Sequence, residues 1–494
     1  MKFVFILLAA TFSGSAMAKS AAPGDYLVKL STSSSSHVLA LQSRLPMGTQ
    51  VENLGVEGWT RVRLPATSVV AFSAASLSRL PGVIKAQPNY AIKLMENPAL
   101  STPAMRERLA RRLMAGGFPG GDAPAADNPE IPMNGSGGSG PDPLFSKQWG
   151  MNQMGVSSAW SATKGNPDMV VAVIDTGVDY THEDLVDNMW RNPGETGVDA
   201  QGRNKATNGI DDDGNGYVDD VVGWDFAAND NKPYDLTASM FEMLLSGGNP
   251  GHGTHCAGNV AARSDNGKGV AGVAPNVRVM ALRFISEKGQ GTTADAVKAI
   301  KYAVDNGAKV TSNSWGSEGD DPADADTNAL KDAIQMAQDR GVLFIAAAGN
   351  GHQGVGYDND TDAKPAVPAS YTHENIISVA AIDVNGALGS FSNWGARSVD
   401  LGAPGVKVFS TVTQSEKYSD TVIDIPGLIT ATWDGTSMAT PHVAGAAALY
   451  WSLHPEKSWR DVKNALLGSV KRSSVLQGKT TSGGQLDVQN LMNF

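Results

Sequence analysis

The chain of 494 residues contains a single cysteine, Cys256. One thiol excludes an internal disulfide, so the fold must be stabilised by packing and by any ions it binds. Long apolar runs are also missing, because no internal stretch approaches the roughly 20 consecutive apolar residues that a membrane helix needs. Excess positive charge is absent as well. The formal net charge of −11 argues against nucleic acid or an anionic membrane as the main partner.

The first 18 residues have the pattern of an export signal. MKFVFILLAATFSGSAMA starts with a basic residue, continues with a short apolar run and ends on a small-x-small cleavage pattern. The sequence therefore predicts a signal peptide at 1–18 and a secreted or periplasmic protein. The hydrophobic content of 41% fits a soluble globular chain, and we expect a monomer without a membrane partner.

Residues 19–96 alternate between strand and helix patterns. The apolar spacing predicts strands at 26–30, 51–56, 59–64 and 83–90 and helices at 36–45 and 69–80. This β-α-β-β-α-β order predicts a small ferredoxin-like α+β domain.

Residues 97–141 lose this periodicity. The segment contains the basic run RERLARR at 106–112, followed by stretches rich in glycine, proline and serine. Such a composition predicts an exposed and cleavable linker. The arginine run has two interpretations, a processing site or a solvated helix face, and the second is the commoner use of a charge run.

From residue 142 onward, apolar strands alternate with amphipathic helices. Continuous apolar runs at 169–175, 277–285, 308–316, 341–350 and 376–383 predict buried parallel strands. Helical patterns at 293–307 and 328–341 each end in a glycine, which is a typical C-cap. This alternation predicts a doubly wound, mainly parallel α/β sheet, which binds ligands beyond the carboxyl ends of its strands.

Two segments of this region hold candidate catalytic side chains. Asp175 ends the first strand, although a turn or a helix cap also uses an aspartate there. GHGTHCAG at 251–258 places His252, His255 and Cys256 within one helical turn. A zinc site needs further ligands and a redox centre needs a second cysteine. His252 is therefore a candidate general base, and the thiol is expected in the core.

A nucleophile and an oxyanion donor complete the candidate set. Ser437 lies at the start of an apolar helix, where free backbone amides and the helix dipole favour a developing oxyanion. An ordinary N-cap serine is the alternative. Asn350 follows FIAAAG at another strand end. Its amide can serve as a second oxyanion donor, and a turn asparagine is the alternative.

The motifs AVIDTGVDYTHEDL, GHGTHCAGNVAA and GTSMATPHVAGAAAL resemble the signature segments of the subtilisin-like serine proteases, the subtilase family, in sequence and in order. The resemblance covers residues 145–494, and we expect the catalytic domain at 142–494. Residues 19–96 resemble the family's inhibitory propeptide. The cysteine beside the histidine resembles the proteinase K branch, in which the thiol lies under the catalytic histidine.

The resemblance implies roles for individual residues. Ser437 would attack the peptide carbonyl while His252 takes and returns its proton, and Asp175 would hold the imidazole in the right tautomer. Asn350 and the Ser437 amide would bind the oxyanion. His255 would be structural.

Substrate recognition is also inferred from the family. Segments 312–319 and 346–354 resemble those that line the P1 pocket and pair with an extended substrate. The expected substrate-binding residues are Ser314, Trp315 and Gly316. Because they include no acidic side chain that could hold an arginine, broad cleavage after apolar or aromatic residues is expected. Glu318 and the insertion at 229–249 leave the P1 preference open.

An acidic loop, TNGIDDDGNGYVDD at 207–220, has the spacing of a calcium loop. Its candidate ligands are Asp211, Asp213, Asn215 and the carbonyl of Tyr217. Position 12 is Val222 instead of glutamate, so the loop is not a complete EF-hand, although Asp219 or Asp220 could close the shell. A solvated acidic turn is the alternative.

The family resemblance implies a second calcium site. Subtilisins bind calcium between an aspartate nine residues beyond the catalytic one and a loop after the histidine helix, which correspond here to Asp184 and Asn266. The sequence identifies no counterpart of the family's N-terminal glutamine ligand. We expect calcium as a structural cofactor.

The sequence thus predicts a secreted, self-maturing serine endopeptidase of broad specificity. Its partners would be protein or peptide substrates and its own propeptide. A processor of basic sites is disfavoured by the missing acidic P1 residue and by the absence of a further domain after LDVQNLM. A calcium-binding, non-enzymatic interaction protein remains the alternative, although all four catalytic positions carry competent residue types.

Overall fold

A computed structural model describes residues 21–32, 34–95, 97–102, 104–105, 107–108, 130–132, 138–236, 251–318, 328–413, 417–425 and 429–494. The predicted signal peptide, most of the arginine run and part of the 229–249 insertion lie outside these residues. Over the described ranges, no helix combines the length and the apolar character that crossing a membrane requires.

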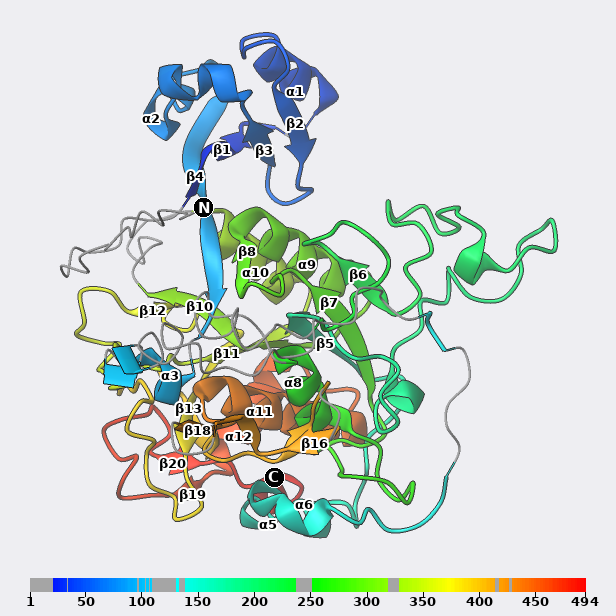
Figure 1. Ribbon diagram of the computed structural model, residues 1–494, viewed down its shortest axis with the longest axis vertical. Helices are drawn as coiled ribbons and strands as arrows, with labels where there is room; N and C mark the ends of the chain where they lie inside the picture. Colours follow the sequence, from blue (N-terminus) through cyan, green and yellow to red (C-terminus); the bar gives the residue numbers. More distant parts are fainter. Residues whose placement is uncertain are drawn as a thin grey trace, which may run out of the picture.

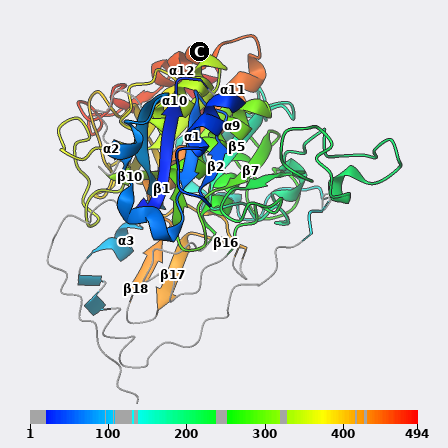
Figure 2. The ribbon, with the colours of Figure 1, turned by 90° about the horizontal axis from the view of Figure 1, so that it is seen from above.

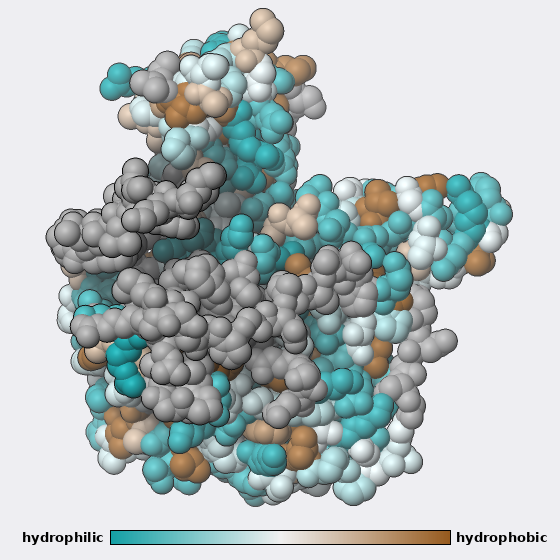
Figure 3. Space-filling view, in the orientation of Figure 1, coloured by the Kyte–Doolittle hydropathy of each residue, from teal (hydrophilic) through white to brown (hydrophobic). Residues whose placement is uncertain are grey.

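The N-terminal domain has the predicted β-α-β-β-α-β order. Its elements are β1 (Ala21–Leu30), α1 (Ser35–Gln42), β2 (Gln50–Asn53), β3 (Trp59–Arg63), α2 (Ala74–Leu77) and β4 (Val83–Leu94). The strands pair antiparallel in the order β4-β1-β3-β2. Val28, Leu41, Val62 and Leu77 belong to its small buried core. In the space-filling view the domain is a lobe that stands on the rest of the molecule (Figure 3).

Two elements of this domain differ from the predicted boundaries. The helix expected at 69–80 is a 3₁₀ turn, η1 (Ala66–Ala71), followed by the short α2. Ser73 separates them because its backbone is extended and its side chain caps α2. The strand expected at 83–90 continues to Leu94, because its second half pairs with strands of the larger domain.

The larger domain is built on a nine-stranded sheet with the order β19-β20-β14-β13-β11-β9-β5-β7-β6. The strands are β5 (Val170–Asp175), β6 (Gly223–Asp225), β7 (Arg278–Arg283), β9 (Val310–Asn313), β11 (Leu343–Ala347), β13 (Ile376–Ile382), β14 (Leu401–Pro404), β19 (Lys471–Arg472) and β20 (Gly484–Gln485). Every pair is parallel except β19 with β20. The prediction of a mainly parallel sheet is confirmed.

Helices cover both faces of this sheet (Figure 1). The main ones are α8 (His252–Ala261), α9 (Thr293–Asp305), α10 (Ala329–Asp339), α11 (Thr436–Leu453) and α12 (Trp459–Gly468). Val171 and Val173 share a core with α8, α11 and α12, whereas the alternate residues Val170 and Ile174 share one with α9 and α10. This alternation explains why the strands are apolar throughout, since both faces are buried.

Shorter elements complete the chain. They are α3 (Pro98–Ser101), η2 (Phe145–Lys147), α5 (Trp149–Gln153), α6 (Val156–Ala159), η3 (Val186–Asn188), η4 (Lys205–Thr207), β8 (Gln290–Thr292), β10 (Trp315–Glu318), β12 (Ala366–Val367), β15 (Ser410–Thr411), β16 (Tyr418–Ser419), β17 (Thr421–Ile425), β18 (Ile429–Thr432) and α13 (Val488–Leu491). Strand β4 leaves the N-terminal domain and runs between β8 and β10, which joins the two domains through one sheet (Figure 1). Seen from above, the β17–β18 hairpin lies beside α3 (Figure 2).

Candidate active site

The site begins where β5 ends and α8 starts. Asp175 is the last residue of β5, His252 is the first residue of α8, and Asp175 Oδ1 lies 2.8 Å from His252 Nδ1. Both side chains are buried. A Cβ on Gly253 would lie 2.0 Å from the Gly177 carbonyl oxygen. A glycine is therefore required for α8 to approach the strand end this closely.

Thr176 links the same strand end to the helix, and sequence reasoning missed it. Its backbone amide and hydroxyl donate to Asp175 Oδ1 at 2.8 and 3.1 Å. The amide of Gly253 in turn donates to the Thr176 hydroxyl at 2.8 Å. These bonds hold the carboxylate toward the imidazole while they hold α8 against β5.

The pKa of His252 lies well above its ordinary value, although burial alone lowers it. Burial is the largest single effect, but the charge and the hydrogen bond of Asp175, together with the interactions of the neighbouring Cys256, outweigh it. The geometry suits a general base whose imidazolium form is stabilised by a buried carboxylate.

His255, three residues along α8, has a different environment. Its Nε2 contacts the Val408 carbonyl at 3.0 Å, and its ring stacks on Trp433 with centroids 4.4 Å apart. Burial lowers its pKa to about 3, so it is neutral at ordinary pH. Because His255 is engaged with a backbone carbonyl, it is not aimed at Cys256 as a shared metal site would require.

Ser437 is the second residue of α11, and its hydroxyl donates to the Ser314 carbonyl at 3.1 Å. The Ser314 hydroxyl returns a bond to the Ser437 carbonyl at 2.9 Å. The thiol of Cys256 lies 3.5 Å from the Ser437 carbonyl and 3.9 Å from His252 Nδ1. The predicted nucleophile and the predicted base therefore lie around one buried thiol.

Asn350 is held by the residue before the predicted nucleophile. The backbone amide and the hydroxyl of Thr436 both donate to Asn350 Oδ1 at 2.9 Å. These two bonds orient the side-chain amide, so its nitrogen points away from Thr436. A Cβ on Gly435 would lie 3.2 Å from this nitrogen. A glycine therefore keeps the approach to the amide open.

Among the expected substrate-binding residues, Trp315 has its side chain in the core of the larger domain. Trp315 is fully buried and packs against Phe284 and Phe344, with ring centroids 5.0 and 6.4 Å away. Its side chain therefore does not face a substrate, and only the backbone of β10 is available for pairing.

The strand expected at 308–316 is divided at Ser314, because that residue bonds to α11 instead of continuing the ladder.

The backbone of β10 is paired with β4. Leu94 lies opposite Trp315 and Lys93 lies opposite Gly316, in antiparallel register. The next residue, Met95, has its sulfur 3.5 Å from the Thr436 hydroxyl. A Cβ on Gly316 would lie 2.9 Å from Met95 Cε. The end of the N-terminal domain therefore enters the candidate site beside the residue that precedes Ser437.

The N-terminal domain also contacts the first turns of α9 and α10. The side-chain oxygens of Asn89 and Gln87 accept from the amides of Ala294 and Ala329 at 2.9 and 3.2 Å. Lys29 and Arg61 form ion pairs with acidic residues of these two helices, at 2.6 Å from Asp332 and 3.4 Å from Asp295. The two domains are thus joined by hydrogen bonds to helix N-termini and by ion pairs, as well as by β4.

The predicted calcium loop lies next to a carboxylate that the sequence analysis missed. Glu195, Asp211 and Asp213 each have a carboxylate oxygen within 4.8 Å of the others. Burial, together with the charges of Asp220 and Asp213, raises the pKa of Glu195 to about 7. A divalent cation would favour the ionised forms of these groups, so the donor set fits calcium.

The other candidate ligands of this loop are engaged within it. Asn215 Nδ2 donates to Asp213 Oδ2 at 3.3 Å and to Asp220 Oδ2 at 2.9 Å. Tyr217 packs its ring against Trp224, with centroids 4.9 Å apart. The loop is therefore tied together by side-chain hydrogen bonds, and Asp220 is its buried end.

The second predicted calcium pair is in contact. Asn266 Nδ2 donates to Asp184 Oδ1 at 2.7 Å, and the Val270 amide donates to Asp184 Oδ2 at 2.9 Å. Asp142, which the sequence analysis did not single out, accepts from the Asn266 amide at 3.3 Å. Burial raises the pKa of Asp142 to about 6, and the charge of Asp184 adds to this effect. Asp184 is buried and Asp142 is partly buried, and this pair of carboxylates also fits calcium.

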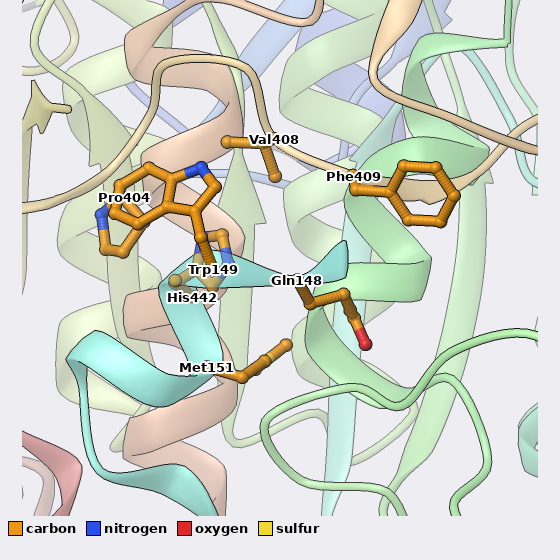
Figure 4. A pocket seen from close by; sticks show the side chains of 8 residues that line it. Gln148, Trp149, Met151, Pro404, Val408, Phe409 and His442 are labelled. Atoms are coloured by element: carbon orange, nitrogen blue, oxygen red, sulfur yellow. The ribbon is translucent and has the colours of Figure 1, made fainter. Parts of the chain in front are cut away.

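A small cavity lies beside α11 (Figure 4). Its volume is about 10 Å³, and its lining includes Trp149, Pro404 and His442. This volume holds about one water molecule. Burial lowers the pKa of His442 to about 4, so the cavity wall carries no charge at neutral pH. The cavity cannot bind a substrate.

Comparison with known proteins identifies relatives of the larger domain. A family model described as the subtilase family matches residues 166–487. A thermophilic serine proteinase of Bacillus sp. (strain AK1) is 37% identical over 302 residues, which are 61% of this chain and 57% of that protein. Thermitase of Thermoactinomyces vulgaris is 34% identical over 309 residues, which are 62% of this chain and 84% of thermitase. The chain thus spans little more than half of the Bacillus relative.

A solved structure shares the fold. The crystal structure of fervidolysin from Fervidobacterium pennivorans, a keratinolytic enzyme related to subtilisin, matches with a TM-score of 0.64 at 22% identity. The match covers 96% of this chain and 61% of that one. It confirms the predicted α/β fold class.

Proposed function

The chain belongs to the subtilase family, and on that premise we propose that it is an exported serine endopeptidase that hydrolyses proteins or peptides. The single observation that carries the proposal is the buried contact of 2.8 Å between Asp175 and His252, beside a thiol that also contacts Ser437. This thiol, of Cys256, lies close to His252 Nδ1 and to the Ser437 carbonyl. Export is supported by the pattern of the first 18 residues.

The proposed reaction is acyl transfer to water. His252 takes the proton from the Ser437 hydroxyl as its oxygen attacks the peptide carbonyl, and the same histidine then protonates the leaving amine. Asp175 keeps Nδ1 protonated and stabilises the imidazolium. The Asn350 amide and the Ser437 backbone amide donate to the oxyanion, which is where charge develops in the transition state. Water then releases the acyl group by the reverse sequence of proton transfers.

We also propose that the N-terminal domain, the predicted propeptide at 19–96, is removed by the enzyme itself at a bond near the end of this range. The support is the entry of β4 along β10 in the antiparallel register that an extended substrate would use. With Lys93 and Leu94 paired to β10 and the Met95 side chain beside Gly316 and Thr436, the bond after Met95 is the one offered for cleavage.

Substrate choice is proposed to be broad, with a preference for apolar side chains at P1. The wall beside Met95 is formed by Gly316 and the Thr436 hydroxyl, which supply no charge. Calcium is proposed as a structural ion, held in one site by Glu195, Asp211 and Asp213 and in another by the three residues Asp142, Asp184 and Asn266. Bound there, it would neutralise the acidic loops and take no part in the reaction.

The test is casein hydrolysis by the chain expressed from residue 19, compared with Ser437→Ala and with Ser158→Ala, an exposed serine of α6. The proposal expects wild type and Ser158→Ala to digest casein and to acquire a new N-terminus after Met95. Ser437→Ala should stay full length and inactive. If folded Ser437→Ala matches wild type in the presence of calcium, the non-enzymatic calcium-binding alternative replaces the proposal.

A further inference from the structure

The chain does not leave the candidate site after Met95. Two residues further on, Asn97 Nδ2 donates to the Thr432 carbonyl at 2.8 Å, and Asn97 Oδ1 accepts from the Ala99 amide at 3.0 Å. The second bond caps α3, which follows at once. One asparagine therefore anchors the linker to the end of β18 and starts its helix.

The helix α3 is seated in a notch of the catalytic domain. Pro98 and Ser101 are buried, and the partly buried Leu100 packs against the main core. A Cβ on Gly354 would lie 2.9 Å from the Pro98 carbonyl oxygen and 3.2 Å from the Ser101 hydroxyl. A glycine with φ of 78° is therefore what lets the loop after Asn350 close on this helix.

The two anchors of the chain contact the segment that leads into Ser437. Met95 contacts Thr436, the residue before Ser437, and Asn97 contacts Thr432, at the start of the turn into α11. The residues before Met95 lie on β10, where the acyl part of a substrate would lie. The residues after it consequently occupy the side toward which the leaving amine of a substrate would extend.

We propose that residues 97–102, the docked linker segment, are a second inhibitory element that fills the leaving-group side of the active site. This inference rests on the proposed protease function. Hydrolysis of the bond after Met95 adds water across it, giving a carboxylate on Met95 and an amine on Glu96. The N-terminal domain is then severed, but the docked linker segment stays covalently attached to the catalytic domain.

Such an attachment keeps the segment at the site. Covalent attachment through residues 103–141 gives an effective concentration of up to about 1 mM, so the segment occupies its notch whenever its dissociation constant is well below that value. Full activity then needs a second cut between Met105 and Asp142, in the stretch rich in glycine and proline. The enzyme would mature in two steps, and the first cut alone would not open the leaving-group side.

The proposal is tested with enzyme matured from the full chain and a capped synthetic peptide of residues 97–105, NPALSTPAM. Initial rates are measured on an internally quenched substrate that extends four residues beyond the cut bond, and on a peptide p-nitroanilide that does not. The peptide should inhibit cleavage of the long substrate competitively, with an inhibition constant below about 1 mM, and leave the p-nitroanilide much less affected. Peptides with Asn97→Ala or Leu100→Asp should inhibit at least tenfold less.

A time course of the precursor provides the second readout, with N-terminal sequencing at each point. In wild type and in the exposed linker variant Glu107→Gln, activity on the long substrate should rise only with the second cut. In Asn97→Ala it should rise with the first.

Inhibition by a scrambled peptide as strong as by NPALSTPAM would overturn the inference, and so would full wild-type activity at the first cut. A precursor that neither cuts itself nor hydrolyses any substrate would instead refute the proposed function.

Discussion

Asp175 and His252 are joined by a contact of 2.8 Å between the last residue of one strand and the first residue of the next helix. The residues are 77 positions apart in the chain, and Thr176 and Gly253 hold the two backbones together around them. The site is therefore set by the sheet and not by a flexible loop, which makes the effects of single substitutions predictable.

Replacing Asp175 with Asn should reduce kcat on the order of 10⁴-fold, because the amide no longer stabilises the imidazolium or fixes its tautomer. The pKa of His252 lies above its ordinary value because of Asp175. In wild type, the acidic limb of the pH–activity profile should therefore have its midpoint above about pH 6.5. Below that pH the histidine is protonated and cannot accept the serine proton.

In Asp175→Asn the residual acidic limb should move to lower pH. The measurement is the pH profile of kcat/KM, with the exposed Asp168→Asn as the matched control. An unshifted limb in Asp175→Asn would show that Asp175 does not set the pKa of the base.

Replacing Asn350 with Ala should lower kcat by about 100- to 1000-fold with little change in KM, because the amide donates mainly to the oxyanion of the transition state. Steady-state kinetics on a peptide substrate measure both constants. Asn385→Ala, in an exposed turn, is the control. A rise in KM at constant kcat would assign Asn350 to ground-state binding instead.

Replacing Met95 with Asp should slow removal of the N-terminal domain at least tenfold. The Met95 side chain lies beside Gly316 and the Thr436 hydroxyl, and neither of these neighbours can form an ion pair with a carboxylate. The rate is followed by gel electrophoresis and N-terminal sequencing. Met47→Asp, at a side chain that is 97% exposed, should mature like wild type. Equal rates in the two variants would place the cut elsewhere.

Calcium should stabilise the protein more at pH 8 than at pH 5. In calcium-free protein, folding raises the pKa of Glu195 to about 7 and that of Asp142 to about 6. Groups with raised carboxyl pKa values favour the folded state when protonated, so this stability is present below about pH 4 and is lost as pH rises to 7. Calcium would replace the lost protons.

Thermal unfolding with calcium or with a chelator, from pH 5 to 8, measures this effect. Glu195→Gln should flatten the pH dependence of the calcium-free protein, while Glu107→Gln should not. A Tm that calcium leaves unchanged at pH 8 would remove both proposed sites.

Much of the fold could be predicted from the sequence, because parallel strands buried on both faces are apolar throughout and helices carry their own stop signals. The length of β4 could not. Its last four residues, 91–94, pair with β8 and β10, some 200 residues further along the chain. The division of the 308–316 run at Ser314 also depends on a partner in α11.

The candidate site also contains residues that the sequence predicted and residues that it did not. Residues within the quoted motifs could be named from the sequence, and the structure brings Asp175, His252 and Ser437 to one end of the sheet. Thr176 was missed although one local signal, a threonine directly after a strand-end aspartate, was available. Glu195 and Asp142 were missed because nothing in their own neighbourhood marks them. Trp315 was expected at the substrate, but its indole fills the core, and only its backbone faces β4.

The central claim is that Ser437 is a nucleophile activated by His252. The most direct test is labelling of the matured protein with a sulfonyl fluoride, followed by peptide mapping by mass spectrometry. The account predicts a single adduct on Ser437, loss of activity in proportion to labelling, and at least a hundredfold slower labelling in His252→Ala. Labelling of another serine, or full activity with Ser437 fully modified, would contradict it.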